Sequence, residues 1–355
     1  MEKEKKVGIL SMHRVVNYGS FWQAYSLKKI IEELNYESDF IDIKNGKQVT
    51  EEKYVRKFSL SKIKRIPYYV FSKKRIKLFN EAHSKFLNLK VPNYDENYKA
   101  IIIGSDEMFN CAQAAPWGFS KQMFGDMNND RVFSYAASYG RTTLEFIKSK
   151  KIDKEMADSL LKMKNISVRD KNSFDIVKNL TEIESEINLD PVLVYKGLEN
   201  EYKEINENKK YILIYGYDFR IKDEEYVNDI KKYAKKNNLQ IISVGTYQSW
   251  CKNVLVDPQE LLGYFKNAEY VVTDTFHGTI FSIRFNRKFS TIVRKSNKQK
   301  LRDLLTRLGL EKRIVNDELN LEKEIKNEID YKKVREILEE EEKNTKEYIL
   351  KNIEG

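Results

Sequence analysis

The sequence predicts an α/β protein of two successive lobes, with a central cleft between them and a helix at its C-terminal end. Its 355 residues suggest two domains, since a domain usually has about 100–200 residues. Short β-branched runs alternate with amphipathic helical stretches, a pattern typical of parallel sheets with crossover helices. A polar stretch after Asp190-Pro191 interrupts this alternation, which then restarts, so we expect two α/β halves joined by a linker.

The first lobe is predicted to span residues 1–195. Short apolar runs predict its strands at 7–10, 39–43, 100–103, 132–136 and 166–168. Helices are expected at 20–34, around 153–163 and from Asp170 onward; the first of these carries an apolar stripe of Trp22, Tyr25, Leu27, Ile30 and Leu34. A basic excursion, residues 47–90, separates the second predicted strand from the third.

The polar residues 196–209 are predicted to link the lobes. In the second lobe, residues 210–330, the same patterns predict strands at 211–215, 240–244, 270–273 and 289–293, and helices at 223–236, 258–266, from about His277, and at 299–308. Residues 331–355 are expected to form the C-terminal helix. Ligands of such sheets bind beyond the carboxyl ends of the strands, so the loops that follow the strands are the places to search for function.

The composition excludes several classes of protein. Hydrophobic residues make up 41% of the chain and aromatic residues 12%, which argues against disorder. No apolar run reaches the roughly 18–20 residues of a membrane span, and the apolar stretch near the start is too short for a signal peptide. Cys111 and Cys251 lie far apart, and no His/Asp/Cys cluster has metal-ligand spacing, so we expect a cytoplasmic protein without a metal site.

The positive charge is concentrated in one segment. The chain has 64 basic and 54 acidic residues, a net charge of +10. Residues 53–77 contain ten Lys/Arg and no acid, interleaved with aromatic and aliphatic side chains. Such a segment can be a solvated helical excursion with its apolar side on the domain, or it can lie against the anionic inner face of a membrane. No nucleic-acid-binding motif accompanies the charge, so no nucleic-acid partner is expected.

The loop after the first predicted strand contains His13, Asn17, Tyr18 and Gly19 at the start of a helix. Glycine permits close approach of the backbone, and the free N–H groups of a helix start can bind an anion. The loop does not have the GxGxxG pattern, so it is not a dinucleotide fingerprint. The structural alternative is that Asn17 and Ser20 serve only to turn the chain and cap the helix.

Two further strand ends carry charge. Ser105 and Asp106 follow strand 100–103, and Arg169 follows strand 166–168. A carboxylate there can orient a sugar hydroxyl or accept its proton, and a guanidinium suits a carboxylate or a phosphate. The structural alternatives are a turn or helix cap for Asp106, and a salt bridge with Asp170 or another acid for Arg169.

The loop after strand 270–273 is the most informative. It contains Thr275, His277, Gly278 and Thr279, and His277 is one of only three histidines in the chain. A helix N-terminus with hydroxyls and a glycine suits a phosphate, and an imidazole beside it can move a proton. A structural hydrogen-bonding role for His277 is the alternative.

Six motifs occur in order along the chain, and RLGLEKR follows them; the six are NYGSFWQAY, IIIGSDEMFN, SYAASYG, ISVRD, LDPVLVY and VVTDTFHGTIFSI. Together they resemble the polysaccharide pyruvyl transferase family, from Val7 to about Arg313. The resemblance implies two Rossmann-like lobes similar to those of GT-B glycosyltransferases, with the acceptor on the first lobe and the donor on the second. It also implies transfer of a pyruvyl group from phosphoenolpyruvate, a co-substrate, onto sugar hydroxyls as a ketal during surface polysaccharide or glycan synthesis. No further cofactor is implied.

The resemblance associates three positions with phosphoenolpyruvate: Arg169, and His277 with Gly278. Characterised members of the family often read Arg-Leu-His-Gly where this chain reads Thr275-Phe276-His277-Gly278. The motif therefore lacks the arginine that the resemblance implies as a partner of the anionic donor. Four cations were considered as replacements: Arg284, Arg294, Lys295 and Arg302.

The chemistry of ketal formation suggests roles for the loop residues. His277 is the candidate general acid, or the group that holds the phosphate as it leaves. Asp106 is the candidate base or anchor of an acceptor hydroxyl, and His13 and Asn17 would help to bind the acceptor from the facing lobe.

Two other functions fit the same features. One is a GT-B glycosyltransferase that uses a nucleotide sugar, because two lobes and a phosphate-binding helix serve that reaction equally well. The other is a non-catalytic glycan- or anion-binding relative, which the threonine at position 275 would suit. The acceptor sugar, its lipid, nucleotide or polymer carrier, and the oligomeric state are not fixed by these motifs.

Overall fold

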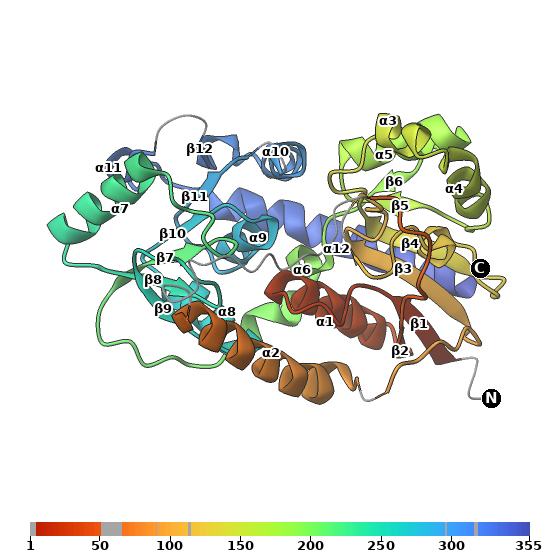
Figure 1. The fold of residues 1–355 in the computed structure, drawn as a ribbon, viewed down its shortest axis with the longest axis horizontal. Coiled ribbons are helices and arrows are strands. Elements are labelled where there is room, and N and C mark those ends of the chain that lie inside the picture. Colours follow the sequence, from red (N-terminus) through yellow and green to blue (C-terminus); the bar gives the residue numbers. More distant parts are fainter. Residues whose placement is uncertain (1–4, 51–65, 90, 113–114, 295–296, 316–318) are drawn as a thin grey trace.

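The computed structural model describes residues 5–50, 66–89, 91–112, 115–294, 297–315 and 319–355. These residues form two α/β lobes that lie side by side, each built on a six-stranded sheet with helices packed around it (Figure 1). Every strand pair recorded in the two sheets is parallel. The two-lobe α/β class predicted from the sequence is confirmed.

The first sheet has the order β2-β1-β3-β4-β5-β6. Its strands are β1 (Lys6–Leu10), β2 (Glu37–Ile41), β3 (Ala100–Asp106), β4 (Val132–Ala137), β5 (Ser167–Val168) and β6 (Glu186–Ile187). Its helices are α1 (Tyr18–Glu33), α2 (Ile66–Leu87), η3 (Lys121–Phe124), α3 (Leu144–Ser149), α4 (Asp153–Leu160) and α5 (Lys171–Thr181). The strand order reverses between β1 and β3, and such a switch point opens a crevice at the carboxyl ends of the two strands.

The second sheet has the order β12-β11-β10-β7-β8-β9. Its strands are β7 (Tyr211–Tyr215), β8 (Gln240–Val244), β9 (Lys252–Val254), β10 (Tyr270–Thr273), β11 (Phe289–Ile292) and β12 (Ile314–Val315). Its helices are α7 (Glu224–Lys236), α8 (Pro258–Asn267), α9 (Phe276–Arg284), α10 (Lys298–Arg307), η5 (Glu311–Arg313) and α11 (Leu321–Glu324). The switch point of this sheet lies between β7 and β10.

The predicted elements of the sheets are present, with shifts at their ends. The strand expected at 39–43 is Glu37–Ile41, and the helix expected to reach 163 ends at Leu160. The three short strands β6, β9 and β12 were not predicted, because two or three residues are too few to show a period. The expected linker 196–209 begins with the 3₁₀ helix η4 (Lys196–Asn200) and continues without regular structure to β7.

The lobes share packing through helices that cross between them. From α1, Tyr18 Oη donates to the carbonyl of Val256 at 2.7 Å and Trp22 Nε1 to that of Pro258 at 3.1 Å, both in the second lobe. The C-terminal helix α12 (Tyr331–Glu354) returns to the first lobe, as Figure 1 shows, and packs on α6 (Pro191–Val194). There Tyr348 donates to the carbonyl of Ser134 at 2.9 Å.

The described part of the basic excursion is largely helix α2, which reaches the second lobe. Residues 53–65 of the predicted basic segment lie outside the described residues. In α2, Arg75 forms an ion pair with Asp218 at 2.8 Å, and Phe71 packs against Tyr247 with ring centroids 5.7 Å apart. One charge of the segment is therefore used to hold α2 against the second lobe. No helix within the described residues is both long and apolar enough to cross a membrane.

The imidazole of His83 in α2 makes stability depend on pH. It packs between the rings of Phe21 and Phe79, and burial lowers its pKa to about 4. The unfolded chain, with an ordinary histidine pKa near 6.5, binds more protons than the folded protein between these values, so stability falls as the pH drops from about 6.5 toward 4.

Replacing His83 removes its contribution to the pH dependence of stability. We expect the loss in free energy of unfolding between pH 7 and pH 5 to be about 2 kcal/mol smaller in His83→Phe than in the wild type. Urea unfolding at the two pH values measures it. An equal loss in both proteins would show that His83 is not buried as the neutral form.

Candidate functional site

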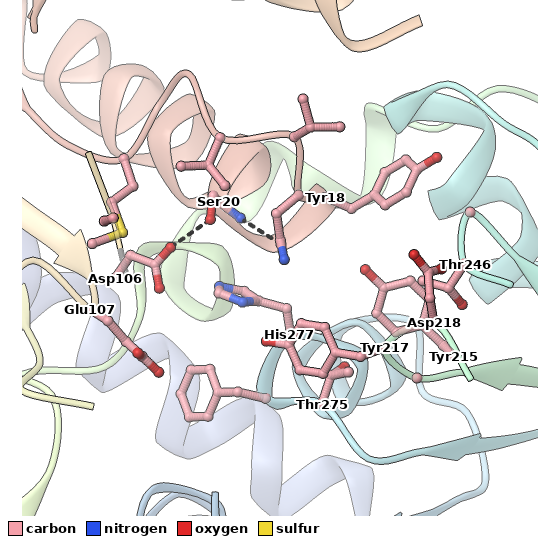
Figure 2. A pocket seen from close by; sticks show the side chains of 18 of the residues that line it. Tyr18, Ser20, Asp106, Glu107, Tyr215, Tyr217, Asp218, Thr246, Thr275 and His277 are labelled. Carbon is pink, nitrogen blue, oxygen red and sulfur yellow. Dashed lines mark hydrogen bonds between the residues drawn. The ribbon is translucent and has the colours of Figure 1, made fainter. Parts of the chain in front are cut away.

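A pocket of about 1230 Å³ lies between the two lobes, where the switch points of both sheets face each other. The carboxyl ends of β1, β3, β7 and β10, with the segments that follow them, contribute to its wall. Their residues there include Asn17, Asp106, Tyr217 and Thr275. Figure 2 shows Asp106 and Glu107 on one side of His277, and Tyr18, Tyr215, Asp218 and Thr246 on the other. The loops singled out in the sequence are therefore brought together from both lobes.

The N-terminus of α1 forms one wall of the pocket. The side chain of Asn17 accepts hydrogen bonds from the backbone N–H groups of Gly19 at 2.8 Å and Ser20 at 3.2 Å, which fixes the first turn of the helix. Ser20 Oγ in turn donates to a carboxylate oxygen of Asp106 at 2.7 Å (Figure 2). Asn17 therefore caps α1, as the structural alternative predicted. The turn that it fixes also places Ser20 to orient the carboxylate of Asp106 at the end of β3.

One buried carboxylate connects the two lobes. Asp190, which caps α6 and is fully buried, lies 2.6 Å from Arg169 and 3.4 Å from Nε2 of His277 through the same oxygen. Arg169 also approaches Asp106 at 3.8 Å. Burial raises the pKa of Asp190, but His277 and Arg169 outweigh it and hold the pKa at about 2. The carboxylate is therefore charged at neutral pH and holds one side chain from each lobe.

Asp190 belongs to the LDPVLVY motif, but the sequence did not predict it as a site residue. An Asp before Pro is typical of a helix cap, and Asp190 does accept a hydrogen bond from Val192 N at 3.1 Å. That local signal hides its second role, because the contact with His277 spans 87 positions of the chain and two lobes.

His277 lies in the first turn of α9, at the point where this helix meets α1. Thr275 Oγ1 caps the helix by accepting the N–H of Gly278 at 2.9 Å. Gly19 of α1 approaches so closely that a Cβ atom added to it would lie 2.2 Å from Nδ1 of His277. Only glycine at this position leaves the imidazole where it is.

Two cations face the aromatic ring of Phe276 in the pocket. The guanidinium of Arg169 lies 4.3 Å from the ring centroid, and the ammonium of Lys300 lies 5.7 Å from it. Lys300 comes from α10 and forms an ion pair with Glu107 at 2.7 Å. The sequence did not predict a site role for Lys300, because the residue lies in none of the six motifs.

Three of the four cations named as replacements for the motif arginine, Arg284, Arg294 and Arg302, lie outside the pocket. Arg284 donates to the carbonyls of Leu193 and Tyr195, and Arg294 pairs with two aspartates of its own lobe. Neither they nor Arg302 lines the described pocket, and Lys295 is outside the described residues.

Five of the predicted residues do not line the pocket: Gly19, which lies against His277, and the four described next. His13 lies 3.4 Å from Asp42 against Phe40, and burial lowers its pKa, so it is a neutral side chain of the first lobe's interior. Ser105 bonds Gln23 at 3.1 Å. Thr279 bonds the backbone of Thr275, and Gly278 packs against Thr273 beneath the same helix start.

The other end of the pocket is lined by aromatic side chains. Figure 2 shows Tyr18, Tyr215 and Tyr217 there, with Asp218 and Thr246. Val15, Val16 and Trp117 of the first lobe extend the apolar wall. Within the described residues, no group of three or more His, Cys, Asp or Glu side chains is arranged to hold a metal ion.

Comparison with known protein families identifies the family of this chain. The model of the family described as polysaccharide pyruvyl transferase matches residues 17–296. The chain belongs to this family. The match includes the loops of Asn17, Asp106, Arg169 and His277, so the family resemblance found in the sequence is confirmed.

Solved structures are similar to this chain only at low identity and with TM-scores below 0.5. A UDP-GlcNAc 2-epimerase from Methanocaldococcus jannaschii is 14% identical with a TM-score of 0.49, over 98% of this chain and 99% of the other. The glycosyltransferase SnogD from Streptomyces nogalater is 10% identical with a TM-score of 0.42, over 96% and 95% of the chains. No curated protein gives a significant match.

The contact between Gly19 and His277 can be tested directly. In Gly19→Ala the new methyl group must displace the imidazole, whereas the helix itself tolerates alanine. With phosphoenolpyruvate, the donor that the family resemblance implies, we expect binding measured by calorimetry to be at least tenfold weaker than in the wild type, and the thermal midpoint to stay within a few degrees. Unchanged binding would show that the position of His277 is not critical to the site.

Proposed function

We propose that this protein transfers the pyruvyl group of phosphoenolpyruvate onto hydroxyls of a sugar in surface polysaccharide or glycan synthesis, releasing phosphate. The observation that carries this proposal is the contact of Arg169 and His277 with a single buried carboxylate at one end of the interlobe pocket. The family implies that these two residues bind the donor, and they come together here although they lie in different lobes.

The donor end has the chemistry that a compact anion needs. Phosphoenolpyruvate carries a carboxylate and a phosphate, which suit a planar guanidinium and the N–H groups of a helix start. Arg169 provides the first and α9 the second. Asp190 fixes the direction of both side chains, so little reorganisation is needed when the donor binds.

The reaction requires one proton to be given and another to be removed. The CH₂ carbon of phosphoenolpyruvate takes a proton while an acceptor hydroxyl forms a bond to the neighbouring carbon. The bond from that carbon to the phosphate oxygen then breaks, and a second hydroxyl closes the ketal, its proton leaving with the released phosphate. His277 is the general acid in this proposal, since its imidazole lines the donor end of the pocket with Nε2 3.4 Å from the Asp190 carboxylate.

Asp106 is the acceptor-side base in this proposal. Its carboxylate is held by Ser20 at the end of β3 and faces the pocket. It is therefore placed to take the proton of an attacking hydroxyl. Aromatic side chains that line the same pocket, among them Trp117 and Tyr217, offer surfaces on which the apolar face of a sugar ring can pack.

Selective stabilisation by the donor tests the proposal. We expect phosphoenolpyruvate to raise the thermal midpoint of the wild type more than inorganic phosphate, UDP or GDP at equal concentration, because ligand binding to the folded state stabilises it. A shift with UDP or GDP alone would favour a nucleotide-sugar glycosyltransferase instead.

Replacing His277 tests its chemical role. We expect His277→Ala to lower phosphate release from phosphoenolpyruvate at least about 100-fold, with methyl hexopyranosides and N-acetylhexosaminides as acceptors. The midpoint of the unliganded variant should change little, because the side chain lines a pocket. Binding of phosphoenolpyruvate by the wild type without phosphate release on any acceptor would point to a non-catalytic binding relative.

A further inference from the structure

Lys300 is placed as a second cation for the donor. Its side chain is 15% exposed, lines the pocket, and shares the ring of Phe276 with Arg169. Its ammonium reaches the pocket from α10, whereas the arginine of the usual family motif would extend from position 275 of the loop before α9. In this chain Thr275 uses its short side chain to cap α9 instead.

The groups around Phe276 leave positive potential available to a ligand. Arg169 contacts Asp190 and Asp106 on one side, and its Nε has no hydrogen-bond acceptor. Within the described residues, the backbone N–H groups of Phe276 and His277 also have no acceptor, since Thr275 satisfies only the two that follow them. An anion at this end would meet donors from both lobes.

The partner of Lys300 is a carboxylate that an anionic ligand can replace. Glu107 is fixed beside Gly140 and accepts a hydrogen bond from Asn110 at 2.6 Å, so it keeps a partner when the lysine moves away. Burial raises the pKa of Glu107, but Lys300, Asn110 and Arg169 outweigh it and set the pKa at about 2. The flexible lysine side chain can therefore turn from one anion to another at neutral pH.

We infer that Lys300 replaces the missing motif arginine and binds an anionic group of phosphoenolpyruvate together with Arg169 and the start of α9. This rests on the proposed function. In the absence of donor, Lys300 pairs with Glu107 across the lobes; when the donor binds, its anion takes the place of Glu107.

Two substitutions that break the same ion pair separate this role from a structural one. Lys300→Met removes the cation, and Glu107→Gln removes only its competitor. We expect Lys300→Met to weaken phosphoenolpyruvate binding at least tenfold by calorimetry, while Glu107→Gln binds it as tightly as the wild type or more tightly. Lys300→Arg should bind within about threefold of the wild type. Lys298→Met, an equal change at an exposed position of α10, is the control.

The outcomes distinguish the two levels of the proposal. If the wild type binds phosphoenolpyruvate and Lys300→Met binds it equally well, Lys300 is not part of the donor site and the inference is wrong. If both variants weaken binding alike, the ion pair serves only to hold the lobes, which also overturns it. A wild type that does not bind phosphoenolpyruvate would overturn the proposed function as well.

A separate observation concerns the outer face of α2. Ile66, Tyr69, Val70 and Ile76 are 38–55% exposed, and Lys73, Lys74 and Lys77 are exposed on the same side of the helix. The opposite side is buried through Phe71 and Phe79 and held by Arg75. Apolar and cationic side chains thus share one solvent-facing stripe on a helix that is fixed to the body of the protein.

We propose that this stripe rests on an anionic lipid surface. The lysine side chains can contact the negative headgroups of such a surface, while the apolar side chains beside them reach its acyl boundary. Arg75 of the same helix lines the pocket, so contact through α2 would bring the pocket close to an acceptor carried on lipid.

Liposome flotation tests this second proposal. We expect the wild type to float with vesicles containing phosphatidylglycerol and not with pure phosphatidylcholine, and to be released by high salt. Lys73→Glu/Lys74→Glu should lose flotation, whereas the control Lys332→Glu/Lys333→Glu on α12 should keep it. Failure of the wild type to float, or equal loss in both double variants, would show that α2 does not bind lipid.

Discussion

The buried carboxylate of Asp190 is the group on which the arrangement of the site depends. A charge without access to water must be paired, and removing one partner of a buried pair typically costs about 3–5 kcal/mol. Asp190 meets this requirement with Arg169 from its own lobe and His277 from the other. The pairing of one carboxylate oxygen therefore ties a side chain of the first lobe to one of the second at one end of the pocket.

Helix ends complete the site around this carboxylate. The starts of α1 and α9 meet at Gly19 and His277, and each is capped by a local side chain, Asn17 or Thr275. Capping leaves the first N–H groups of α9 directed at the pocket. Because both caps come from the loops after β1 and β10, the two sheets place their switch points, and with them the polar groups, on opposite walls of one cavity.

The threonine at position 275 illustrates how one site can redistribute charge. A short capping side chain there leaves the motif without its arginine, and the pocket contains Lys300 from α10 instead. A cation contributed by a different element serves the same electrostatic need, provided that its partner Glu107 can release it. This exchange is invisible in a motif comparison, since the motif and the lysine lie more than twenty positions apart.

The sequence by itself determined the two α/β halves, because long buried parallel strands such as β3 are continuous apolar runs, and it located Asp106, Arg169 and His277, because function gathers at strand ends. Only the tertiary structure decided which of these groups meet. In the sequence Asp190 stood only at the break between the two predicted halves and Lys300 belonged to none of the six motifs, while His13 lies in the interior of the first lobe and not in the pocket. The reason is physical: capping and periodicity act over a few residues, whereas charge pairing and burial depend on distances in space that no local pattern records.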